Sequence, residues 1–98
     1  METLLNREND KLVITVKGRV DTTTAPELEK AIFDNIDGVK ELVLDLKDMP
    51  YTSSAGLRVL LKGEKAMKSQ GKMTITNVCD DVMDIFEMTG FSDILTIE

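Results

Sequence analysis

The sequence predicts an α/β fold in which helices pack against a mixed, mostly parallel β-sheet. Short apolar runs of strand length alternate with longer runs whose apolar residues recur at helical spacing, the pattern of parallel strands joined by crossover helices. Asn9-Asp10 separates two short strand-like runs and predicts a hairpin, so the first strand is expected to lie antiparallel to the second. The 98 residues are expected to form a single domain spanning 1–98.

Short runs rich in β-branched and aliphatic residues predict the strands. The third of these runs is almost continuously apolar, as in a strand that is covered on both faces. The last run follows a glycine and is expected to form a final strand. The predicted strands are 3–7, 11–17, 42–46, 72–77 and a terminal segment within 91–97.

The first helix is expected to begin near Pro26, a residue suited to a first helical turn. Thr24 and Glu27 have the spacing of a capping box, in which each side chain bonds the backbone of the other residue. Gly38 is expected to end this helix.

The second helix is expected over 54–69 and the third over 82–89. Gly63 in the middle of the second helix costs about 1 kcal/mol relative to alanine, which suggests close packing of this helix on the sheet. Asp80 or Asp81 is expected to cap the third helix, and Gly90 to end it.

Composition excludes several classes of function. Twelve basic against eighteen acidic residues give a net charge of −6, which argues against nucleic acid or an anionic membrane as the main partner. The chain has no histidine, so Ser-His-Asp and Cys-His catalysis are ruled out, and no metal site or cofactor is expected. Cys79 is the only cysteine, and no apolar run reaches the ~20 residues of a membrane helix. We expect a cytoplasmic protein that is not an enzyme.

Two adjacent hydroxyl groups, Ser53 and Ser54, lie where the third predicted strand passes into the second helix. One interpretation is structural, because a serine at a helix start caps free backbone N–H groups. The other is phosphorylation, which adds about −1.5 to −2 charges at a position where the helix dipole tolerates them. The residues alone leave both interpretations open.

The motif around these serines resembles the signature of the STAS domains of bacterial anti-sigma factor antagonists. Further stretches resemble the family's first strand-to-helix junction, its approach to the phosphorylation site and its C-terminal short helix with a Gly-aromatic turn, so the resemblance covers nearly the whole chain. In order along the chain, the matching runs are GRVD at 18–21, TAPEL at 24–28, LDL at 44–46 with Met49, YTSSAGLRVLL at 51–61 and VMDIFEMTGF at 82–91.

The resemblance implies a STAS-type fold and a protein that binds an anti-sigma factor which is also a serine kinase, so that a sigma factor is released. It implies that the kinase inactivates the protein by phosphorylating a serine at the start of the second helix, and that a serine phosphatase restores it. Alignment on Gly56-Leu57 places the acceptor at Ser54. Ser53 stands where many members have aspartate, and it remains an alternative acceptor.

Several residues are candidates for contacts around this site. The resemblance places Asp21, with its neighbour Thr22, beside the acceptor, although Asp21 is equally consistent with a turn-capping role. Gly56 is expected to permit a close approach of backbone or of the partner. Arg58 and Lys62, followed by Lys65, form a basic stripe that either meets an acidic partner or is a solvated helix face.

Two other functions stay open from the sequence: a constitutive STAS scaffold whose serines only cap, and a small-ligand sensor built on the same fold. A receiver domain phosphorylated on Asp45 fits poorly, because no acidic pair follows the first long strand to hold Mg²⁺.

Overall fold

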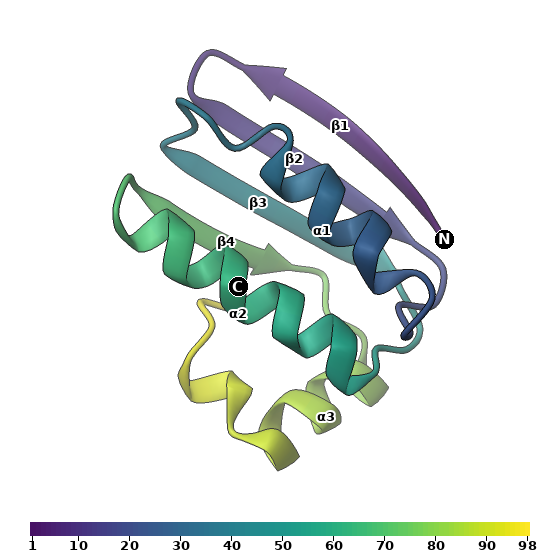
Figure 1. Ribbon diagram of the computed structural model, residues 1–98. Coiled ribbons are helices and arrows are strands. Elements are labelled where there is room, and N and C mark those ends of the chain that lie inside the picture. The colour runs from purple at the N-terminus through teal and green to yellow at the C-terminus, as the bar shows by residue number, and fades with distance from the viewer.

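The computed structural model describes all 98 residues and contains the mixed, mostly parallel sheet that the sequence predicts (Figure 1). Its strands are β1 (Glu2–Glu8), β2 (Lys11–Lys17), β3 (Glu41–Asp48) and β4 (Lys72–Thr76), which lie in that order across the sheet. β1 pairs antiparallel with β2, whereas the β2–β3 and β3–β4 pairs are parallel. The predicted hairpin is therefore confirmed.

Helices α1 (Ala25–Phe33) and α2 (Ser54–Lys68) lie side by side over one face of the sheet (Figure 1). α3 (Asp80–Thr89) and the single-turn 3₁₀ helix η1 (Phe91–Asp93) follow β4 and appear below α2 in the view of Figure 1. None of these helices combines the length and the apolar character that a membrane span requires.

Side chains of the central strands alternate between the helix-covered face and the opposite face. The expectation that the third strand is covered on both faces is wrong, because α1 and α2 cover only one of them. Val43 and Asp45, which point away from the helices, are only half-buried. The buried residues that face the helices are Leu12, Ile14 and Val16 of β2 and Leu42, Leu44 and Leu46 of β3.

The predicted capping box of the first helix does not form. Thr24 is the N-cap residue of α1, but its side chain makes no cap bond to the helix, and its hydroxyl donates to the carbonyl oxygen of Arg19 at 2.9 Å. The partner residue Glu27 therefore has no reciprocal bond to complete. α1 also ends at Phe33, before the expected stop; Gly38 lies in the following turn with a φ of 78°.

The C-terminal segment was expected to form a strand, and this expectation is wrong. Gly90 ends α3 in the left-handed conformation, with a φ of 81°, and the chain then folds into η1. The segment meets the sheet edge only through one isolated parallel bridge, Ile97 to Ile75 of β4, in which Ile75 N–H donates to the carbonyl oxygen of Thr96 and Glu98 N–H donates to that of Ile75. The predicted cap of α3 by Asp80 or Asp81 also fails, because both lie within its first turn.

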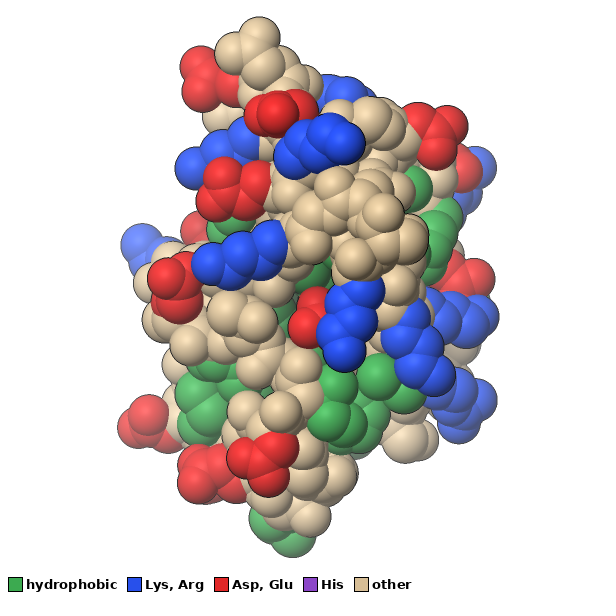
Figure 2. All heavy atoms as spheres, turned by 90° about the vertical axis from the view of Figure 1, so that its left-hand side faces the viewer, with side chains coloured by type: hydrophobic (Ala, Val, Ile, Leu, Met, Phe, Trp, Pro, Cys, Tyr) green, Lys and Arg blue, Asp and Glu red, His purple; other side chains and the backbone are tan.

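Figure 2 shows the end of the molecule that carries the β1–β2 turn and the C-terminal end of α2. Hydrophobic side chains are visible mainly in the lower half of this view, where α3 and η1 lie. Two of the large exposed hydrophobic residues belong to this region, Met88 at 86% exposure and Ile94 at 46%. The two serines lie at the other end of α2, where β3 passes into the helix.

Candidate functional site

Two strand-to-helix junctions meet at the carboxyl edge of the sheet. The chain leaving β2 pairs with the chain leaving β3, because Val20 N–H donates to the carbonyl oxygen of Tyr51 at 3.0 Å and Ser53 N–H donates to the carbonyl oxygen of Val20 at 2.8 Å. Val20 and Thr52 form a parallel bridge, and both are buried. This bonding fixes the serine pair against the first junction.

The two serines occupy different environments. Ser53 is the N-cap residue of α2, with extended backbone (φ −96°, ψ 178°), but its side chain makes no cap bond. Its Oγ is buried and has no hydrogen-bond partner. Ser54 is the first residue of α2, and its side chain is exposed. The capping interpretation is therefore wrong for this geometry, since neither hydroxyl bonds the helix backbone.

The start of α2 leaves backbone donors free. The first backbone bond of the helix runs from Leu57 N–H to the carbonyl oxygen of Ser53, at 3.1 Å. The N–H groups of Ser54, Ala55 and Gly56 have no acceptor in the chain, and the first turn holds no acidic side chain. These donors and the positive end of the helix dipole favour negative charge beside Ser54.

Gly56 lies in a place with no room for a side chain. A Cβ atom there would overlap Thr52 Oγ1 and lie 2.8 Å from Val20 Cγ1. Both neighbours are buried, and they come from the two paired junctions. Glycine therefore lets the first turn of α2 pack directly on both junctions, which is an internal close approach.

Asp21 organises the first junction. Its Oδ1 accepts hydrogen bonds from Thr23 Oγ1 (2.6 Å), Thr23 N (3.0 Å) and Thr24 N (3.1 Å), and the hydroxyl of Thr24, shared with the carbonyl oxygen of Arg19, lies 3.2 Å away. These bonds, the Thr23 hydroxyl first among them, lower the pKa of the Asp21 carboxyl to about 2. All of them serve the local turn, as the turn-capping interpretation requires.

Asp21→Asn is expected to lower the melting temperature, and the loss should depend on pH. Because the folded-state pKa lies below the unfolded value of about 3.9, the stabilising contribution is full above about pH 4 and disappears as the pH falls towards 2. Thermal unfolding of both proteins between about pH 2 and 6 measures this difference. Asp84→Asn is the control, since the Asp84 side chain is exposed and makes no hydrogen bond or ion pair. A pH-independent difference for Asp21→Asn would contradict the assignment.

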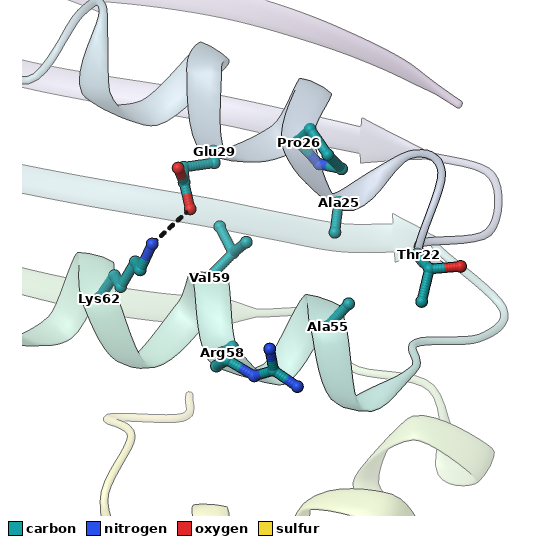
Figure 3. A pocket seen from close by; sticks show the side chains of 8 residues that line it. All are labelled: Thr22, Ala25, Pro26, Glu29, Ala55, Arg58, Val59 and Lys62. Atoms are coloured by element: carbon teal, nitrogen blue, oxygen red, sulfur yellow. Dashed lines mark hydrogen bonds and ion pairs between the residues drawn. The ribbon is translucent and has the colours of Figure 1, made fainter.

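A groove of about 340 Å³ lies between the N-terminal halves of α1 and α2, next to the serine pair (Figure 3). Lys62 crosses it, with its Nζ 3.0 Å from Oε1 of Glu29 on α1. Of the predicted basic stripe, Arg58 and Lys62 therefore line the groove, whereas Lys65 does not. The lining residues are Thr22, Ala25, Pro26, Glu29, Ala55, Arg58, Val59 and Lys62.

Two features of this region could not be foreseen from the sequence. Glu29 reaches Lys62 from another helix, 33 positions away in the chain. The guanidinium of Arg19 lies 4.5 Å from the ring centre of Tyr51, a cation–π contact between the two junctions. Both pairings join segments that are distant in the sequence, and no local pattern signals them.

The comparisons with known proteins agree with this architecture. The family model for the STAS domain matches residues 3–98. The anti-sigma-B factor antagonist of Listeria monocytogenes is 33% identical over 96 residues, which cover 94% of this chain and 82% of the relative.

Among solved structures, an anti-sigma factor antagonist from Mycobacterium paratuberculosis superposes with a TM-score of 0.89 at 25% identity, covering 98% of this chain and 83% of the other. The Bacillus cell fate determinant SpoIIAA in its phosphorylated form shares the fold, with a TM-score of 0.76 at 15% identity and coverage of 99% and 91%. Sequence, fold and family model thus converge: the chain belongs to the STAS domain family.

Proposed function

We propose that this protein is an anti-sigma factor antagonist that binds an anti-sigma factor with serine kinase activity and thereby frees a sigma factor. We further propose that Ser54 is the residue which that kinase phosphorylates, and that a serine phosphatase reverses the modification. The observation that carries the second proposal is the contrast between an exposed Ser54 and a buried Ser53 Oγ at the start of α2.

Accessibility distinguishes the two candidate acceptors. A kinase must bring the γ-phosphoryl group of its ATP in line with the attacking hydroxyl oxygen. The Ser54 side chain is open to solvent, whereas the Ser53 Oγ is enclosed and its backbone N–H is bonded to Val20. Modification of Ser53 would require the paired junctions to open, and modification of Ser54 would not.

The fold is suited to hold a phosphate on Ser54. The free N–H groups of the first turn of α2 and the absence of acidic side chains there make the added charge tolerable. SpoIIAA, which shares this fold, has been solved in a phosphorylated form. The modification is therefore expected to change the surface rather than the architecture, so that binding is lost because the partner meets a new charge.

The test is phosphorylation by a candidate anti-sigma factor kinase from the same organism, with ATP and Mg²⁺, followed by peptide mass spectrometry. We expect one phosphate on Ser54 in the wild type and in Ser53→Ala, and none in Ser54→Ala. Phosphate on Ser53 in the wild type would overturn the assignment of the acceptor. A chain that stays unmodified would instead favour a constitutive STAS scaffold.

A further inference from the structure

Arg58 is a free cation placed one helical turn after the proposed acceptor. It follows Ser54 by four residues on α2, so the two side chains lie on the same side of the helix. Arg58 is exposed and makes no ion pair or hydrogen bond with any other side chain. Figure 3 shows its guanidinium directed along α2 towards the N-terminal end of the helix.

The other charges of the groove are already paired. Glu29, the carboxylate that lines the same groove, is held by Lys62 at 3.0 Å, on the next turn of α2. The Asp21 carboxylate is already hydrogen-bonded to the two threonines of its own turn. Arg58 therefore has no intramolecular anion in the unmodified protein, and it is the cation of the groove that is left for an incoming negative group.

Another pair of oppositely charged side chains four residues apart does form an ion pair in this protein. Lys30 Nζ, on α1, lies 2.7 Å from Oδ2 of Asp34, which directly follows the helix. That pair has the cation first, which is the less favourable order with respect to the helix dipole. A phosphoserine at position 54 followed by Arg58 has the anion first, and the guanidinium offers parallel N–H donors to phosphate oxygens.

We propose that Arg58 binds the phosphate on Ser54 and so acts as the internal phosphate-holding residue of the switch. This inference rests on the proposed function. It gives the modification two simultaneous effects on the surface: a negative charge is added at Ser54, and the positive charge of Arg58 is withdrawn from the α1–α2 groove. A partner carboxylate that pairs with Arg58 in the unmodified protein would then lose its counterion and face the phosphate.

The experiment uses full-length protein with phosphoserine installed at position 54 during translation, so that no kinase is needed. The second ionisation of the phosphate is followed by ³¹P NMR as the pH is varied. A nearby guanidinium favours the dianion and lowers this pKa from its ordinary value of about 6. Arg58→Gln is expected to raise the pKa of the phosphoserine by about 0.3 to 0.7 unit relative to the parent phosphoprotein. In Arg58→Lys, the pKa of the phosphoserine is expected to lie between its values in the parent phosphoprotein and in Arg58→Gln.

Lys65→Gln is the matched control, because it removes the same charge from the same helix. Lys65 lies about 16 Å along the axis from Ser54, beyond the ~8 Å screening length at physiological salt, so its loss should barely move the pKa. A shift for Arg58→Gln no larger than that for Lys65→Gln would overturn the inference. This titration is independent of the kinase assay: failure of Ser54 to be phosphorylated refutes the proposed acceptor, and an unchanged phosphate pKa refutes only the role of Arg58.

Discussion

Gly56→Ala is expected to destabilise the protein by about 2 kcal/mol, although alanine is the better helix former by about 1 kcal/mol. The new Cβ would overlap Thr52 Oγ1 and lie 2.8 Å from Val20 Cγ1. Neither neighbour can move freely, because Val20 and Thr52 are buried and their backbones are bridged to one another. The first turn of α2 must then shift off both junctions. Urea denaturation of the variant and the wild type measures the difference.

Gly63→Ala is the matched control, since both glycines are buried on the same helix. A Cβ at Gly63 meets the Sδ of Met73 at 3.1 Å, and the predicted close packing of this residue on the sheet is confirmed. The thioether is flexible and can yield, which leaves the gain in helix propensity to offset the remaining strain. We expect Gly63→Ala to stay within about 1 kcal/mol of the wild type. Equal losses for the two variants would show that the junctions do not constrain Gly56.

Phosphorylation of Ser54 is expected to weaken binding to the anti-sigma factor by at least about 100-fold, or roughly 3 kcal/mol. The phosphate brings about −1.5 to −2 charges to an exposed position beside the α1–α2 groove. A partner surface that pairs with Arg58 there is necessarily acidic or polar, and like charges in contact cost several kcal/mol. Isothermal titration calorimetry with the two forms gives the affinities directly.

We expect the position of the phosphate, and not only its charge, to determine how strongly binding to the anti-sigma factor is weakened. Phosphoserine at position 69 adds the same charge at the other end of α2, about 22 Å away along the helix. This control should bind almost as tightly as the unmodified protein. If it lost affinity as strongly as phosphoserine at position 54, the effect would come from net charge and not from the surface around Ser54.

Local sequence was sufficient to predict the architecture. Short β-branched and apolar runs located the four strands of the sheet, helical spacing located the three helices, and Asn9-Asp10 predicted the antiparallel first pair, with Asn9 at a φ of 55°. These signals are strong where an element buries one face, as β2, α1 and α2 do, because the spacing of its apolar residues records which face that is.

Two of the expectations that failed depended on the path that the backbone takes in the folded protein. Thr24 has the sequence of a helix cap, yet its hydroxyl is used by Arg19 and by the backbone of Asp21 in the folded junction. The apolar residues after Gly90 fit a strand as well as a turn, and only the path back to β4 decides between them. The pattern of apolar residues in the sequence predicts neither the bonds of the Thr24 hydroxyl nor the path of the chain after Gly90.

The sequence predicted which residues belong to the candidate site, but it did not predict how their side chains are arranged. The serine pair, Asp21 and the basic residues were all identified from the sequence. Which serine is accessible depends on how deeply the junctions pack, and the sequence places the two hydroxyls in equivalent chemical contexts. The pairing of Glu29 with Lys62, which leaves Arg58 free, joins two helices and has no local signature.

The central claim is that the unmodified protein frees a sigma factor and that phosphorylation at Ser54 prevents this. The most direct measurement adds the protein to a preformed complex of the anti-sigma factor with its sigma factor and follows the free sigma factor by analytical gel filtration. We predict that the unmodified protein releases the sigma factor in proportion to the amount added, and that the protein with phosphoserine at position 54 releases almost none. Equal release by both forms, or release by neither, would contradict the account.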